Sequence, residues 1–275
     1  MKISEIIESG KRLAAQGVEV SRVTKQDFLT AKSAIKPLLD RAGLDSGWTA
    51  GGAGSFDPAH PYGGGGRETS GDIDIMIDPQ DLQQQFPPDL EAYNTASSKP
   101  LGAKAMANTL ADPAKKSRLE LSASKWALAT YMTNNGFPTD PGTLTVEYKS
   151  QGKSFSIDLI VRPKSSWELH AHDFSTDPEM RGGDLWTQMY PVLAKLASKT
   201  TFTDPKTGEE KGNLQYSPDR GLVDRDTNKV VAIKKDDIAK ILLGPDATAR
   251  DLSSMTGIRR ALANQPEKLS KLPQV

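Results

Sequence analysis

The chain has 275 residues with 35 basic and 35 acidic side chains, so its formal net charge is zero. Proteins that grip nucleic acid over many phosphates are usually basic, so this balance argues against tight, processive binding and leaves room for a local basic patch. The lack of cysteine excludes disulfides, thiolate metal sites and thiol nucleophiles.

The first residues lack the apolar run of a signal peptide, and no segment has the length of a membrane span. We therefore expect a soluble, cytoplasmic protein with no membrane partner. Hydrophobic residues make up only 36% of the chain, and the 23 glycines and 18 prolines predict long loops.

Two amphipathic helices are predicted at the start of the chain. Residues 3–17 carry apolar side chains at helical spacing and end near Gly17, which is typical of scaffold. Thr24 is a predicted N-cap for the second helix, and Pro37 within that helix predicts a kink or an earlier stop. The apolar stripe of this second helix contains Phe28, Ala31, Ile35, Leu38 and Leu39.

A glycine-rich stretch follows over residues 47–66. Its backbone N–H groups and the Ser55 hydroxyl are suited to cradling a triphosphate, because glycine lets the backbone approach a ligand closely. No Lys-Ser or Lys-Thr pair follows the glycines, so the stretch is not a Walker-type P-loop.

Residues 72–78 alternate strictly between two faces of a predicted strand. Ile73, Ile75 and Ile77 share one face, and Asp72, Asp74, Met76 and Asp78 share the other. Neighbouring carboxylates repel each other, and the simplest compensation is a divalent cation that prefers oxygen ligands, such as Mg²⁺ or Mn²⁺. Asp78 is expected to lie at the strand end, in solvent.

A second strand is predicted to supply a third carboxylate. After a proline-rich, loop-like stretch over 79–100 and a helix over 117–135, residues 143–148 and 155–161 form a predicted hairpin. Asp158 lies on the opposite face of this hairpin from its apolar residues. If the strands around Asp74 and Asp158 are neighbours, three carboxylates converge as a two-metal phosphoryl- or nucleotidyl-transfer site requires.

Beyond Pro163 the pattern predicts a further domain. We expect a helix over 184–198, a hairpin over 221–234 closed by turn residues, a helix over 236–243 that begins with solvated charges at 234–237, a helix over 248–263, and a frayed tail after 266. His170 and His172 could contact metal or phosphate, but we interpret the pair as polar surface.

One segment reads Gly54-Ser55-Phe56, and a second reads Arg67-Glu68-Thr69-Ser70-Gly71-Asp72-Ile73-Asp74. Together they resemble the signature of family X DNA polymerases, within the polymerase-β-like nucleotidyltransferase superfamily, and a thinner similarity extends over roughly 20–245. The resemblance implies an α+β fold, with a nucleotidyltransferase palm (a mixed sheet with flanking helices) and a smaller C-terminal thumb-like α+β subdomain. The implied domains are an N-terminal helical segment over 1–46, the palm over 47–167 and the thumb-like domain over 168–275.

Roles for particular residues follow from the same resemblance. Asp72, Asp74 and Asp158 would be catalytic and would hold two Mg²⁺ or Mn²⁺ ions. Residues that would contact the nucleotide are Gly54, Ser55, Arg67, Gly71 and Phe174. The family's arginine pair is replaced by residues 57–66, and Arg67 or Arg162 could substitute for it. The implied protein is a monomer that takes a nucleoside triphosphate and a short DNA primer or gapped DNA, as in DNA repair.

Two other readings of the chain stay open. The same chemistry could transfer a nucleotide to RNA, to a protein hydroxyl or to a small molecule, and the neutral charge and missing arginine pair favour this reading. In the second reading the chain is a non-enzymatic binding module that has lost its catalytic site, and it would show no metal-dependent nucleotide binding.

Overall fold

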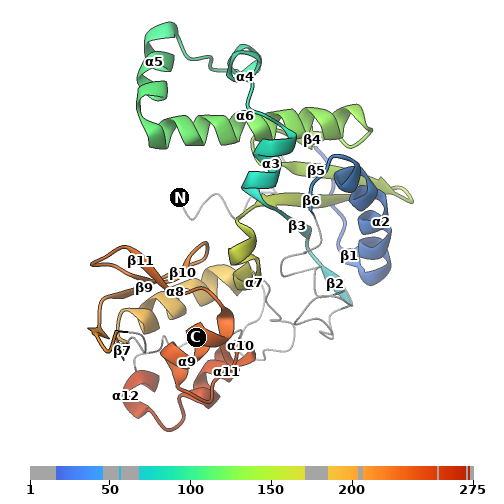
Figure 1. The fold of residues 1–275 in the computed structure, drawn as a ribbon. Helices are drawn as coiled ribbons and strands as arrows, with labels where there is room; N and C mark the ends of the chain where they lie inside the picture. The colour runs from blue at the N-terminus through green and yellow to red at the C-terminus, as the bar shows by residue number, and fades with distance from the viewer. Residues whose placement is uncertain are drawn as a thin grey trace. The chain divides into compact units, whose positions relative to one another are not determined.

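The structure is a computed structural model that describes residues 17–45, 56, 68–170, 185–203, 207–252, 254–270 and 272. The chain divides into two compact units, with the change of unit between Lys164 and Ser165. We call residues 17–45 and 68–164 the sheet unit, and residues 165–272 with Phe56 the C-terminal unit. The expected α+β fold class is confirmed, since both units combine helices with small sheets (Figure 1).

A mixed four-stranded sheet with the order β3-β6-β5-β4 organises the sheet unit. Strand β3 (Ile73–Ile77) lies parallel to β6 (Lys153–Val161). Strand β5 (Thr145–Ser150) is antiparallel to β6, and β4 (Thr139–Asp140) is antiparallel to β5. Strands β1 (Val23–Thr24) and β2 (Thr69–Ser70) form a separate antiparallel pair.

The predicted hairpin between β5 and β6 is confirmed, and its turn explains the register. Gln151 and Gly152 both have positive φ, at 51° and 76°, which is the conformation of a two-residue type I′ hairpin turn. This turn pairs Thr145 with Asp158 at the far end of the ladder. The register that places Asp158 is therefore set by the turn and by the alternation along β6.

The helix predicted after Thr24 is confirmed as α2 (Lys25–Arg41). Thr24 and Asp27 form a reciprocal capping box, which satisfies backbone donors at the helix start. The helix continues through Pro37 to Arg41, so an earlier stop is wrong, and the chain leaves it at Gly43 with φ 73°. The helix expected over 3–17 lies outside the described residues except for Gly17 at its end.

Helices also fill most of the stretch expected to be loop. They are α3 (Pro79–Gln85) and α4 (Leu90–Ala96), and beyond this stretch α5 (Ala103–Ala111) and the long α6 (Pro113–Asn134) follow. The prolines mislead because Pro79 and Pro113 stand at the first helical position, where the missing N–H costs nothing. In Figure 1 α4 and α5 lie on the side of α6 away from the sheet.

The C-terminal unit begins within a short 3₁₀ turn, η3 (Lys164–Ser166). Its helices are α7 (Trp167–His170), α8 (Leu185–Ala197), α9 (Lys235–Leu243), α10 (Ala249–Leu252), α11 (Met255–Ala261) and α12 (Pro266–Leu269). Its strands are β7 (Phe202–Thr203), β8 (Glu210–Lys211), β9 (Leu214–Ser217), β10 (Gly221–Asp224) and β11 (Lys229–Ala232). The order β11-β10-β9 includes the predicted hairpin, whose turn is held by Asp224 accepting from Asp226 N at 2.9 Å.

Three expectations for this unit are wrong, each for a local reason. Lys235 is only 1% exposed, because it precedes Ile238 by three positions and falls on the buried stripe of α9. The helix expected over 248–263 is split, because Ser254 caps a new helix by accepting from Gly257 N. The first residues of the expected frayed tail form α12, where Lys268 Nζ donates to Leu242 O at 3.1 Å.

Candidate metal centre

The two strands that carry the predicted carboxylates are neighbours. Parallel pairing of β3 with β6 places Asp74 directly opposite Asp158, and Asp72 precedes β3 by one residue. Because successive side chains of a strand point to opposite faces, Asp72 and Asp74 share the face of Asp158. The isoleucines of β3 and the residues Phe155, Ile157 and Leu159 of β6 are buried.

The three carboxylates converge closely enough to share a cation. One carboxylate oxygen from each of Asp72, Asp74 and Asp158 lies within 4.8 Å of the others, and each residue is half-buried. Oxygen-only ligand sets suit Mg²⁺, Mn²⁺ and Ca²⁺ rather than softer metals. The residues present thus fit a divalent cation, which would also relieve the repulsion among three negative charges.

The sheet continues this polar face beside the carboxylates. Ser156 lies two residues before Asp158 on β6, is fully buried, and makes no hydrogen bond through Oγ within the described part of the chain. On the other side of Asp158, Thr145 of β5 is buried and donates to Thr143 Oγ1 at 3.0 Å. Hydroxyl groups therefore flank Asp158 along its own strand and across the ladder.

Asp78 does not belong to this cluster, and its expected exposure to solvent is wrong. The residue is only 8% exposed, because helix α3 begins directly after β3 and uses Asp78 as its N-cap. Oδ1 accepts from Gln80 N at 2.8 Å, and Oδ2 accepts from Lys164 N at 2.8 Å. Asp78 thus joins the end of β3 to the segment that follows β6.

Lys164 is a supporting residue that the sequence analysis did not identify. Its ammonium group lies 3.0 Å from Asp45 Oδ2 and 3.1 Å from Asp81 Oδ2, and hydrogen bonds to Asp45 and then Asp81 raise its pKa. The contact ties the exit of α2, the start of α3 and the segment after β6 together. No spacing rule links three residues so far apart in sequence, so only the fold reveals the cluster.

The predicted nucleotide contacts are mostly outside the described part of the chain. This holds for Gly54, Ser55, Arg67 and Phe174, and also for His172. Gly71 is exposed, and a Cβ added there would meet nothing within 4 Å. Arg162, which follows β6, is half-buried and donates from one guanidinium nitrogen to Val161 O at 3.3 Å.

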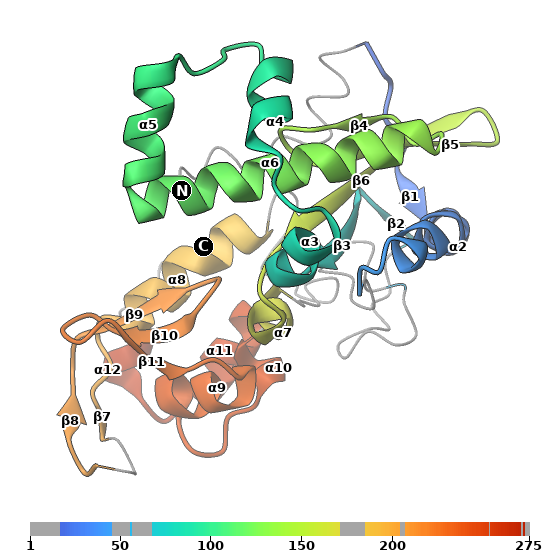
Figure 2. The same cartoon turned by 45° about the horizontal axis from the view of Figure 1, so that its top comes forward.

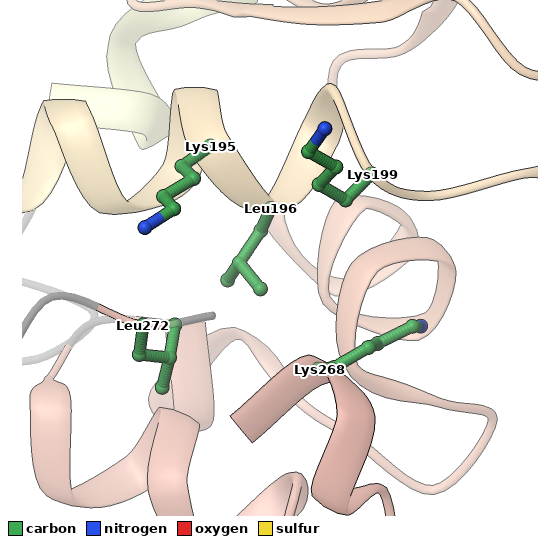
Figure 3. Close-up of a pocket in the computed structure, with 5 residues that line it drawn as sticks. All are labelled: Lys195, Leu196, Lys199, Lys268 and Leu272. Carbon is green, nitrogen blue, oxygen red and sulfur yellow. The ribbon is translucent and has the colours of Figure 1, made fainter. Parts of the chain in front are cut away.

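A small cavity in the C-terminal unit is lined by Lys195, Leu196, Lys199, Lys268 and Leu272 (Figure 3). It holds about 10 Å³, which is room for no more than one water molecule. The three amino groups point away from one another in Figure 3 and do not converge on an anion. Burial lowers the pKa of Lys268. The cavity is therefore a packing gap between lysine stems and two leucines.

None of the helices in the described ranges combines the length and the apolar run needed to cross a bilayer. A scan against models of known protein families finds no match, and a search of curated proteins finds no significant similarity.

Proposed function

We propose that the chain is a metal-dependent nucleotidyltransferase that adds nucleotides to a 3′-hydroxyl, in the manner of family X DNA polymerases. The observation that carries the proposal is the lateral pairing of Asp74 with Asp158, with Asp72 completing a triad within 4.8 Å. The motif around Gly71 and Asp72 supports the same conclusion by resemblance. Its cofactors would be two Mg²⁺ or Mn²⁺ ions.

In this proposal the residues divide the chemistry between them. Asp72 and Asp74 would hold both ions, and Asp158 would ligate the catalytic ion and accept the proton of the attacking hydroxyl. The bound ions would supply positive charge that stabilises the attacking and leaving oxygens. The 3′-oxygen forms a bond to the α-phosphorus as the bond from that phosphorus to the bridging oxygen breaks, and pyrophosphate leaves.

The sheet positions the three carboxylates relative to one another. The β3–β6 pairing fixes the backbone spacing of Asp74 and Asp158, while the Asp78 and Lys164 contacts hold the ends of the two strands. Catalytic groups must be held within a fraction of an ångström of the productive geometry, and strands hold them better than loops do. Asp78 and Lys164 would thus act as positioning residues.

A primer-extension assay tests the proposal directly. Wild-type protein should extend gapped, recessed or single-stranded primers with Mg²⁺ or Mn²⁺, and Asp158→Asn should reduce extension by at least about a hundredfold. Asp40→Asn is the matched control, because Asp40 is an exposed carboxylate of α2 paired only with Lys36 in the described chain. If no nucleotide is incorporated into any of these primers, the polymerase assignment is wrong.

A different acceptor is the second candidate, and the zero net charge of the chain favours it. The enzyme would then transfer a nucleotide to RNA, to a protein hydroxyl or to a small molecule. Incubation with labelled nucleoside triphosphates followed by mass spectrometry distinguishes these acceptors. A protein that neither binds nucleotide with metal nor releases pyrophosphate would be a binding module instead.

A further inference from the structure

The sheet unit carries a basic helical projection between β3 and β6. We define the arm as residues 97–118, which cover α5 and the first turns of α6. Its only carboxylate is Asp112, and its cations are Lys99, Lys104, Lys115, Lys116 and Arg118. The arm therefore concentrates positive charge within a chain whose net charge is zero.

The arm has a defined shape. Asn94 and Leu101 exchange two hydrogen bonds, Asn94 Nδ2 to Leu101 O at 3.0 Å and Leu101 N to Asn94 Oδ1 at 2.7 Å, which close the loop before α5. Asp112 then caps α6 by accepting from Ala114 N and Lys115 N. Both views place α5 against the N-terminal end of α6 (Figures 1 and 2).

The arm buries none of its residues, although α5 and the first turns of α6 are regular helix. Lys99, Lys104 and Arg118 are exposed and form no ion pair with the described residues. Lys115 pairs with Asp112, and Lys116 lies 3.8 Å from a carboxylate oxygen of the following turn. Three cations are thus available to an external partner.

We propose that the acceptor is a nucleic-acid strand and that the arm binds its phosphate backbone. This inference rests on the proposed function and deepens it by making the acceptor a nucleic acid. Serine, threonine and asparagine side chains lie among the cations, and such polar side chains commonly hydrogen-bond phosphate oxygens. Single strands are commonly held by positive surfaces of this kind, without base-specific contacts.

The distribution of apolar and acidic side chains favours nucleic acid over other anionic partners. A membrane-binding helix needs a broad apolar face, whereas the arm's one large exposed apolar side chain is Leu110, at 39%. A groove lined by Trp126 of α6 also carries two carboxylates from the start of α4, Asp89 and Glu91. These carboxylates mark where the positive surface ends. A polyanion would therefore follow α5 and the start of α6 rather than α4.

Fluorescence anisotropy with a labelled single-stranded oligonucleotide, measured over a series of salt concentrations, tests the inference on the full chain. The arm variant carries Lys99→Ala, Lys104→Ala and Arg118→Ala. Because each phosphate contact on a single strand contributes about 0.7 to the slope of log K against log salt, we expect the slope to fall by up to about 2. The affinity at low salt should fall about 10- to 100-fold.

A matched control carries Lys25→Ala, Lys149→Ala and Lys153→Ala, which remove the same charge from exposed positions elsewhere in the sheet unit. The control should keep the wild-type salt slope. Equal affinities of the arm variant and the control would overturn the inference, as would binding of the wild type to anionic phosphatidylserine vesicles but not to the oligonucleotide. Circular dichroism and the melting temperature verify that the arm variant is folded.

Anisotropy measures binding and primer extension measures turnover, so the inference and the proposed function can fail separately. Arm-dependent binding by a wild type that extends no primer would overturn the proposed function alone. Primer extension with no contribution of the arm to binding would overturn the arm inference alone.

Discussion

The repulsion within the carboxylate triad predicts that Asp74→Asn stabilises the metal-free protein. At 4.8 Å, each pair of charges repels by about 1 kcal/mol in water and about 3.5 kcal/mol at an effective dielectric constant of 20. The substitution removes two of the three pairs. Since the carboxylates are half-buried and solvent screens them, we expect a net gain of about 1–2 kcal/mol, or roughly 2–8 °C in Tm.

Thermal unfolding in EDTA and then in excess Mn²⁺ provides the assay. The wild type should gain stability from Mn²⁺, by about 2.7 kcal/mol at a concentration one hundred times its Kd, while Asp74→Asn should gain little. The order of stability should therefore reverse between the two conditions. Glu91→Gln, at an exposed carboxylate, should show neither effect. A variant that is less stable in EDTA and still responds fully to Mn²⁺ would refute the reasoning.

Three further predictions concern stability. Gly221→Ala should cost about 3 kcal/mol or more by urea denaturation, because φ is 70° and the new Cβ would lie 2.2 Å from Ala232 O. Asp78→Ala should cost about 2–3 kcal/mol by the same measurement, since it leaves Lys164 N and the first turn of α3 without their acceptor. Burial raises the pKa of Asp251, but hydrogen bonds from an arginine and a threonine outweigh it, so the folded-state pKa is lowered. The resulting stability is present above the unfolded pKa of about 3.9 and is lost as the pH falls below it. In urea denaturation measured from pH 3 to 6, Asp251→Asn should therefore show a smaller drop in midpoint at the acid end than the wild type does.

Each of these stability predictions has its own check. Gly152 also has positive φ, but a Cβ there meets open space, so Gly152→Ala should cost only about 1 kcal/mol. A similar loss for both glycine variants would show that the contact with Ala232 O is unimportant. An unchanged midpoint for Asp78→Ala would show that its two backbone hydrogen bonds do not stabilise the strand ends. If the urea midpoint of Asp251→Asn falls towards pH 3 as much as that of the wild type, another carboxyl group causes the loss of stability.

The sequence was sufficient to predict the strands that form the site. Period-two alternation around Ile75 and Ile157 fixes which side chains are buried, and that leaves Asp74 and Asp158 on the opposite face. Cap chemistry was equally informative, because Thr24 acts through hydrogen bonds to residues only three positions away. These features depend on neighbours within a few residues, which is why a single sequence reveals them.

Features that depend on distant partners were not predictable in this way. Asp78 resembles the end of an exposed strand until the fold brings Lys164 N to it, from 86 residues away. Lys235 carries a charge on an otherwise apolar stripe, and charge alone suggests solvent. Pro79 reads as a loop residue unless the preceding aspartate is recognised as a helix cap.

Manganese binding followed by electron paramagnetic resonance tests the central claim most directly. With a non-hydrolysable nucleoside triphosphate present, we predict that the wild type binds Mn²⁺ and that Asp74→Asn and Asp158→Asn, on different strands, each lose that binding. Asp40→Asn should bind as the wild type does. Binding that survives Asp158→Asn, or a wild type that binds no Mn²⁺, would contradict a shared cation site between β3 and β6.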